Sequence, residues 1–204
     1  MKRPTLADPK DAAHVRMVQV QVLANDWFTL KKNTFDYQRS DGTWQRQSRE
    51  TYDRGNGAVV LLFNSAQQTV VLTKQFRFPA YANGHADGML IEACAGLLDG
   101  ADAAERIQKE IHEELGFQIT HPRKLFEAYM SPGSVTEKLH FFAANYTAQD
   151  RIAKGGGLVA EGEDIHVLEI PLSTALDMVR TGQIEDGKTI MLLQYAALAG
   201  LENV

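Results

Sequence analysis

The stretch from Gly96 to Phe117, read GLLDGADAAERIQKEIHEELGF, predicts a turn that leads into one short amphipathic helix. Ala104, Ile107, Ile111 and Leu115 recur in it at three- and four-residue intervals. Residues at that spacing lie on one side of a helix, so the four side chains form an apolar stripe that packs against the rest of the chain.

The ends of this helix are also marked in the sequence. Asp102 precedes Glu105 by three residues, which is the spacing of a capping box, and Gly116 is a natural left-handed stop. The spacing predicts an α-helix of about three and a half turns.

Three acids share one patch near the end of the helix. Glu110 and Glu114 are four residues apart and therefore adjacent, with Glu113 beside them. Like charges at this spacing destabilise a helix by roughly a few tenths of a kcal/mol per pair. A hard cation such as Mg²⁺ would compensate them, because it takes oxygen ligands shared between carboxylates and substrate phosphates. The alternative is a solvated acidic face, partly offset by Arg106 and Lys109.

Composition narrows the function classes. A formal charge of −5 over 204 residues, with no long Lys/Arg run, argues against a protein that grips nucleic-acid backbones. Cys94 is the single cysteine, which excludes an intrachain disulfide and is consistent with a cytoplasmic location. No run reaches the roughly 18 apolar residues that a membrane span needs, so we expect no membrane association.

The remaining pattern predicts an α+β fold. Short alternating runs around an Asp41-Gly42 turn indicate a small N-terminal β subdomain. Apolar runs at 58–63 and 69–76 predict strands buried on both faces. Further strands are expected at 89–94, 124–129, 139–146 and 165–170, a mobile loop at Gly155–Gly157, and closing helices at 171–180 and 188–200. The predicted organisation is a flexible tail at 1–16, a β subdomain at 17–54 and a main domain at 55–204.

The order of Gly96, an acid at Asp102 and the ending KEIHEELGF at 109–117 resembles the Nudix box. It departs from the usual pattern at Asp102, which replaces a glutamate, at Lys109, which replaces an arginine, and in a spacer one residue shorter. Other stretches between Trp27 and Lys188 resemble the nucleoside-diphosphate-sugar branch of the Nudix hydrolases, and most of all its members that act on GDP-mannose. The resemblance implies an α/β/α sandwich with a mixed sheet, and an N-terminal β subdomain that exchanges contacts across a homodimer.

The resemblance also implies a reaction, the hydrolysis of a diphosphate bond with the help of Mg²⁺ or, as an alternative, Mn²⁺. GDP-mannose would give GMP and mannose 1-phosphate. The metal ligands carried over by motif are the main-chain carbonyl of Ala95 and the side chains of Glu110, Glu114 and Glu163. Glu113 assists, and Glu161 is an alternative to Glu163 as loop ligand or general base; the catalytic acids are thus Glu113, Glu114, Glu161 and Glu163.

Substrate contacts are implied in the same way. Trp27 matches an aromatic that stacks on the nucleobase from the neighbouring subunit; the alternative is a partly buried strand residue. Glu92 either supports the metal shell or is a buried, paired acid. The other matches are to phosphate, ribose, sugar or box-turn contacts, at Arg49, Glu50, Arg54, Arg77, Gly96, Leu97, Glu137 and Lys188.

Two rival functions remain open on the sequence. The first is hydrolysis of ADP-ribose to AMP and ribose 5-phosphate, which needs the same diphosphate chemistry. The second is a non-catalytic nucleotide-sugar sensor; the intact set of helix acids weighs against it, because a binder has no need of three unscreened carboxylates.

Overall fold

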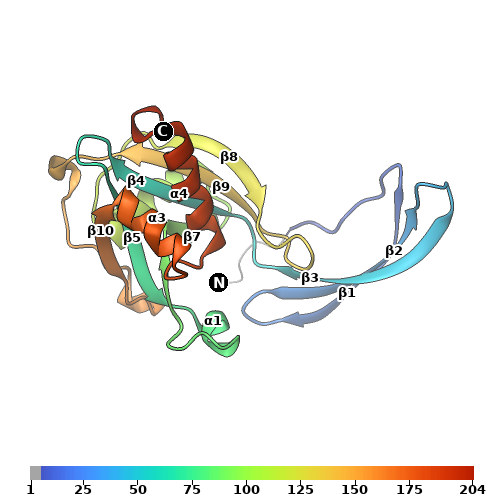
Figure 1. Cartoon of the computed structure of the whole chain (residues 1–204). Coiled ribbons are helices and arrows are strands. Elements are labelled where there is room, and N and C mark those ends of the chain that lie inside the picture. The colour runs from blue at the N-terminus through green and yellow to red at the C-terminus, as the bar shows by residue number, and fades with distance from the viewer. Residues whose placement is uncertain (1–5) are drawn as a thin grey trace. The chain divides into compact units, whose positions relative to one another are not determined.

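The computed structural model describes residues 6–204, which divide into two compact units. The first unit holds residues 6–56 together with Tyr129–Lys138, and the second holds Gly57–Ala128 together with Leu139–Val204 (Figure 1). The sequence predicted the boundary between the two parts of the chain at 54/55, two residues before the observed one, and it did not predict that Tyr129–Lys138 belongs to the first unit. Within the described residues, no helix is long and apolar enough to cross a membrane.

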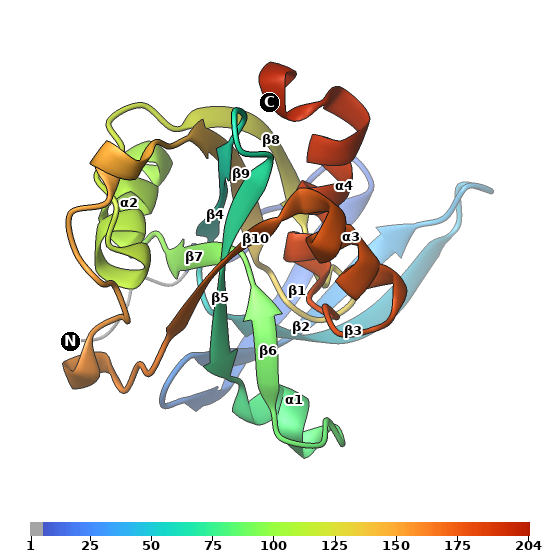
Figure 2. The ribbon, with the colours of Figure 1, turned by 60° about the vertical axis from the view of Figure 1, so that its left-hand side comes forward.

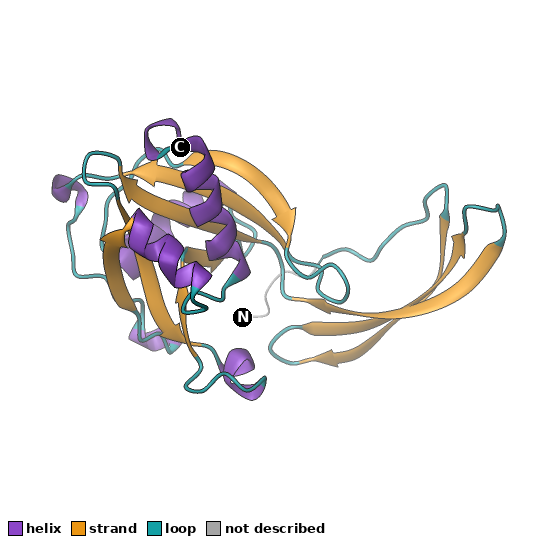
Figure 3. Ribbon diagram, in the orientation of Figure 1, coloured by secondary structure: helices purple, strands orange, loops and turns teal. Residues whose placement is uncertain are grey.

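The first unit is a three-stranded antiparallel sheet in the order β1-β2-β3 (Figure 3). The strands are β1 Val15–Asn25, β2 Thr29–Gln38 and β3 Trp44–Asp53. Asp41 accepts a hydrogen bond from the Thr43 N–H at 2.9 Å, and Gly42 has a φ of 84°, in the β2–β3 turn. The predicted hairpin at Asp41-Gly42 is confirmed.

Segments from outside the strands attach to this sheet. The Leu6 N–H donates to Asp53 Oδ2 at 2.7 Å, and Lys31 Nζ pairs with Asp8 at 2.9 Å. The Tyr52 N–H donates to the Ser134 carbonyl at 2.8 Å. The flexible tail was expected at 1–16, but Leu6 and Asp8 are bonded to the sheet and β1 begins at Val15. Residues 1–5 of that expected tail lie outside the described residues.

The second unit is built on a seven-stranded mixed sheet. Its order is β10-β5-β4-β9-β8, with β6 paired to β5 and β7 paired to β4. The central strand β4 runs antiparallel to β5 and parallel to β9, which makes the sheet mixed. The strands are β4 Gly57–Asn64, β5 Thr69–Phe76, β6 Met89–Glu92, β7 Cys94–Leu97, β8 Arg123–Tyr129, β9 Lys138–Asn145 and β10 His166–Pro171.

Helices cover both faces of this sheet (Figure 2). The helix α2 (Ala103–Glu110) lies on one face, and α3 (Leu172–Arg180) and α4 (Gly187–Ala199) lie on the other. Because β4 lies between two helical layers, all of its residues are buried, as its unbroken apolar run predicts. The α/β/α sandwich, the α+β class and the separate N-terminal sheet are therefore as expected.

The apolar stripe of the acid-bearing helix packs against the face of β4 that carries Ala58 and Val60. Ile107, Ile111 and Leu115 are fully buried in one cluster with Ala58, Val60 and other sheet residues. Side chains of a strand alternate between faces, so this half of β4 holds the acid-bearing helix in place.

Three local predictions need correction. The single strand expected at 89–94 is two strands, because the Ala93 N–H donates to Thr189 Oγ1 at 2.6 Å instead of joining the ladder. The helix α2 ends at Glu110 and continues as a π-helical turn, Ile111–Leu115. A five-residue helix, α1 Phe78–Ala82, was missed, because one turn is too short to show a helical period. Short 3₁₀ turns also occur, at Ala148–Asp150, Val159–Glu161 and Leu201–Asn203.

Candidate active site

The acid-bearing helix starts and stops where the sequence predicts. Asp102 is the N-cap, and its carboxylate accepts from the N–H groups of Ala104 at 2.8 Å and Glu105 at 3.3 Å. Gly116 ends the π turn in the left-handed region, with a φ of 77°. The helix position is therefore fixed at both ends by local chemistry, and the buried stripe fixes which way its acids face.

Burial separates the three helix acids. Glu110 is 4% exposed and Glu114 is 2% exposed, whereas Glu113 is only partly buried. A solvated acidic face, the alternative left open by the sequence, therefore does not describe Glu110 or Glu114. The structure places the apolar stripe and these two acids in the same interior, because positions four apart on a helix share an edge.

The electrostatics of the pair are unfavourable without a counter-charge. Burial, opposed by Arg106 and reinforced by Glu163 and Glu113, raises the pKa of Glu110 to about 7. Burial is also the main reason that the pKa of Glu114 rises to about 8, with Glu110 adding to it. The nearby positive charges thus do not fully compensate the burial of either carboxylate.

Several contacts partly neutralise the acids. Arg106 Nη2 lies 2.5 Å from Glu110 Oε1, without the angles of a hydrogen bond, and Lys109 Nζ lies 3.4 Å from Glu113. The neighbouring Cys94 thiol lowers the pKa of Glu114, but by less than burial raises it. Even so, Glu114 Oε2 has no hydrogen-bond partner among the described residues.

These residues fit a divalent cation. An unpartnered, buried carboxylate oxygen beside a second buried acid is the donor chemistry that Mg²⁺ uses, and Mg²⁺ commonly takes one or two carboxylates and completes its shell with water and phosphate oxygens. Among the described side chains, no three His, Cys, Asp or Glu are already grouped as a ligand set. The site therefore offers a carboxylate pair rather than a complete protein cage.

Strand β7 carries Ala95, Gly96 and Leu97, for which the sequence predicts metal or substrate contacts. Ala95 and Gly96 pair with Val59 and Ala58 of β4. A Cβ on Gly96 would collide with the Glu110 carboxylate, so this side chain occupies the space that any other residue at 96 would fill. Gly96 thus has a steric reason to be glycine, and β7 places Ala95 and Leu97 on either side of it.

Glu92, at the end of β6, is a buried, paired acid. Arg77 donates to both of its oxygens, at 2.6 and 3.1 Å, and Lys188 Nζ donates to Oε2. Burial would raise the pKa of Glu92, but the charges and hydrogen bonds of Lys188 and Arg77 outweigh it and lower that pKa to about 2. Arg77 and Lys188, both predicted to contact substrate, are therefore held by one internal carboxylate.

The same network contains residues that the sequence analysis missed. Asp186 caps α4 by accepting from the Thr189 N–H at 3.0 Å, and it also pairs with Lys188 at 2.9 Å. Thr189 is fully buried and bonds to Ala93, where β6 gives way to β7. The Asp-x-x-Thr spacing is a capping signal, but its link to a strand 96 residues away has no local trace in the sequence.

We expect Glu92→Gln to lower the free energy of unfolding at pH 7 by about 3 kcal/mol, since it removes the buried charge that pairs the largely buried Lys188 and the partly exposed Arg77. The native pKa of about 2 lies below the ordinary 4.5, so the stabilisation is present above pH 4.5 and is lost as pH falls toward 2. Urea unfolding of both proteins between pH 7 and pH 3 measures the difference, which should shrink below pH 4.5. A difference that stays constant across this range would contradict the assignment.

The structure describes the side chain of only one of the two predicted loop acids, Glu163 and Glu161. Glu163 Oε2 accepts from the Leu158 N–H at 2.8 Å. Glu161 ends a 3₁₀ turn, Val159–Glu161, and its side chain lies outside what the structure describes. The choice between Glu161 and Glu163 as general base remains a prediction.

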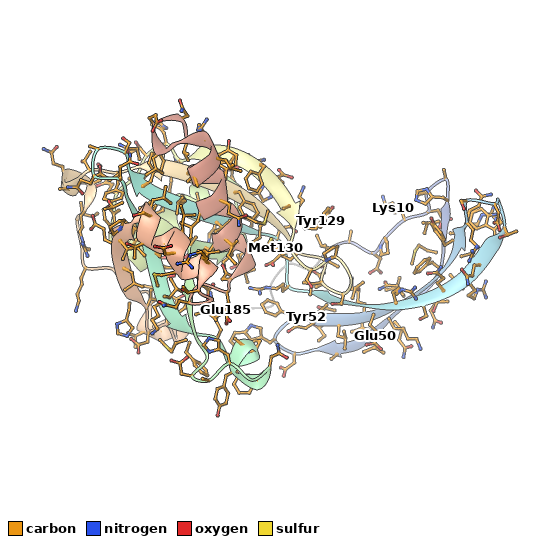
Figure 4. All side chains as sticks on the ribbon, in the orientation of Figure 1. Lys10, Glu50, Tyr52, Tyr129, Met130 and Glu185 are labelled. Atoms are coloured by element: carbon orange, nitrogen blue, oxygen red, sulfur yellow. The ribbon has the colours of Figure 1, made fainter. Side chains whose placement is uncertain are left out.

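The other predicted substrate residues belong to the first unit. Trp27 is 73% exposed in the turn between β1 and β2, which excludes the partly buried strand aromatic. Arg54 pairs with Glu137 at 3.4 Å, and Arg49 donates to the Ser48 carbonyl at 2.8 Å. Glu50 projects from the exposed side of β3 (Figure 4). The structure thus brings Arg54 and Glu137 together and leaves Trp27 open to solvent.

Comparison with known proteins gives one match to the N-terminal region and several to nearly the whole chain. Residues 14–52 match the family described as "GDP-mannose pyrophosphatase NudK N-terminal domain". The chain is 53% identical over 186 residues to a GDP-mannose pyrophosphatase of Pectobacterium atrosepticum, covering 91% of this chain and 95% of that protein. It is 50% identical to one of Salmonella arizonae, over 92% and 97%. A crystal structure of an ADP compounds hydrolase shares the fold, with a TM-score of 0.67 at 19% identity, over 96% of this chain and all of the other.

Proposed function

The chain belongs to the GDP-mannose pyrophosphatase family of Nudix hydrolases, and on this premise we propose that it hydrolyses the diphosphate bond of GDP-mannose, giving GMP and mannose 1-phosphate with Mg²⁺ as cofactor. The relatives support the coarser statement, that the chain is an enzyme that cleaves nucleotide-sugar diphosphates. The substrate, the products and the metal are the proposal.

The single observation that supports a bound metal ion is the buried pair of carboxylates. Glu110 and Glu114 are withdrawn from water, with one oxygen of Glu114 unpartnered among the described residues, and burial raises both pKa values. A protein keeps such a pair only where something compensates it. We propose that Glu110, Glu114 and Glu163 hold the cation with the Ala95 carbonyl and that Glu113 assists, with Mn²⁺ as an alternative metal.

A bound cation would neutralise the diphosphate, lower the pKa of a water molecule and stabilise charge on the leaving oxygen. The chain's own residues do the rest. Glu163, or Glu161 in its place, takes the proton of the attacking water, since both lie on the same acidic loop. Arg77 binds a phosphate oxygen through the part of its side chain that stays exposed, while Glu92 fixes its orientation.

The first unit supplies the nucleoside and sugar contacts in this proposal. The open face of Trp27 offers a π surface for a base. Arg49, Glu50, Arg54 and Glu137 offer donors and acceptors for ribose, phosphate and sugar. The family resemblance supports their delivery from a neighbouring copy.

A homodimer is part of the same proposal. Val18, Val22, Leu23 and Trp44 are large apolar residues exposed on the first unit, and a second copy could cover them. Sedimentation equilibrium should give a mass of twice 22.7 kDa. A mass of 22.7 kDa at micromolar concentration would rule the dimer out.

The test of the proposed function is a substrate panel. Release of monophosphate is measured from GDP-mannose, ADP-ribose, other nucleotide sugars and free nucleoside diphosphates, with Mg²⁺ and with EDTA. We expect the highest kcat/KM for GDP-mannose and no turnover in EDTA. A preference for ADP-ribose would keep the chemistry and change the substrate, whereas tight binding without any turnover would favour a sensor.

A further inference from the structure

Two of three successive glycines, Gly155–Gly157, hydrogen-bond the loop that carries Glu161 and Glu163 to the acid-bearing π turn. The Gly156 N–H donates to the Glu114 carbonyl at 2.9 Å, and the Gly157 N–H donates to the Glu113 carbonyl at 3.1 Å. The last carbonyls of a helix have no partner within the helix, so these two bonds satisfy the backbone of the residues whose side chains are the candidate ligands. The sequence predicted a mobile loop at Gly155–Gly157; hydrogen bonds hold this part instead.

At two of these positions the backbone is left-handed and an added Cβ would meet a close contact. Gly155 has a φ of +72°, and a Cβ there would collide with the Glu114 carbonyl oxygen and lie 2.6 Å from the Leu115 carbonyl carbon. Gly157 has a φ of +78°, and its Cβ would lie 2.5 Å from Glu163 Oε2. The first glycine therefore lets the loop approach the π turn, and the third leaves room for the loop acid.

The far end of the loop returns to the same glycines. The Ile165 N–H donates to the Gly156 carbonyl at 3.1 Å, and the Glu163 N–H donates to the Leu158 carbonyl at 3.3 Å. Gly156 thus donates its N–H to the π turn, and its carbonyl accepts from Ile165, which directly follows Glu163 and Asp164. The hydrogen bonds of Gly156 therefore link the backbone of the helix acids to the backbone of the segment that carries Glu163.

We propose that Gly155–Gly157 is a positioning element that fixes the backbone of the helix acids Glu113 and Glu114 relative to that of the loop acid Glu163, so that their side chains can reach a shared cation. The inference rests on the proposed function, because it takes these acids as the ones that hold the metal. It adds residues that touch neither metal nor substrate and act through the backbone of those that do.

Gly155→Ala tests the element, with Gly182→Ala as matched control. Gly182 has a φ of +74°, and a Cβ added there would have nothing within 4 Å, so it carries the same backbone cost without the collision. The primary readout is the Kd of Mn²⁺ without substrate, measured by electron paramagnetic resonance. We expect Gly155→Ala to weaken Mn²⁺ binding at least tenfold and to lower kcat with little change in KM, and Gly182→Ala to stay within twofold of the natural protein. Equal Mn²⁺ affinities for the two variants would overturn the proposal.

A double-mutant cycle covers the case in which Gly155→Ala does not fold. A Cβ at Gly157 meets mainly the flexible Glu163 side chain, so Gly157→Ala should fold. If Gly157 acts through Glu163, Gly157→Ala weakens Mn²⁺ binding in the natural protein but not in a Glu163→Ala background. The same loss in both backgrounds would overturn the proposal. A natural protein that binds neither Mn²⁺ nor Mg²⁺ would instead overturn the proposed metal site, and this inference with it.

Discussion

Glu114→Gln is expected to lower kcat by at least about a thousandfold, equivalent to about 4 kcal/mol in the activation free energy. The substitution removes the ligand charge at the most buried acid of the site while keeping the size of the side chain. An amide oxygen is a weak ligand for Mg²⁺, which prefers carboxylates. Steady-state hydrolysis of GDP-mannose, with Mn²⁺ binding measured in parallel, gives the result.

The fold should survive this change. Burial disfavours the charge on Glu114, so its removal relieves an unfavourable interaction in the absence of metal. Glu105→Gln is the control, because it is the same substitution at an exposed acid of the same helix. Activity of Glu114→Gln equal to that of Glu105→Gln would show that Glu114 is not a ligand. Lost activity together with a lost circular dichroism spectrum would show a structural role.

The helix that carries Glu114 illustrates what can be predicted from a sequence. Its N-cap at Asp102, its stop at Gly116 and its buried stripe follow from chemistry within three or four residues, and all three are confirmed. The π turn was not predicted, because Gly116 and the stripe suit an α-helical ending equally well. The backbone partners of that turn come from Gly156 and Gly157, about forty residues further along the chain.

Burial and pairing of the acids were harder to predict. The amphipathic pattern placed Glu110 and Glu114 beside the stripe, but how deeply they lie depends on the width of the sheet beneath them. Glu92 had two alternatives, which were decided by Lys188, a residue 96 positions away. Local sequence shows a strand acid and a helix-start lysine; only the packing of α4 against β6 makes them a pair.

Gly96→Ala is expected to lower kcat about a hundredfold, although the change adds one methyl group. In the structure the new Cβ would occupy the space of the Glu110 carboxylate, so either that carboxylate or strand β7 has to move. Movement of either displaces a proposed metal ligand, since β7 also carries the Ala95 carbonyl. Positioning errors near 1 Å reduce catalysis by about this factor.

Gly133→Ala is the control that separates this collision from the general effect of replacing glycine. Neither Gly96 nor Gly133 has a positive φ, so alanine adds no backbone strain at either position, and a Cβ at Gly133 has nothing within 4 Å. We expect Gly133→Ala to keep its activity, and Gly96→Ala to lose Mn²⁺ affinity along with kcat. If Gly96→Ala loses kcat but binds Mn²⁺ as well as Gly133→Ala does, Glu110 is not a ligand, and the effect comes from β7 acting on the substrate alone. Because the three closest contacts of the added Cβ are all with Glu110, this pair of variants tests Glu110 separately from Glu114.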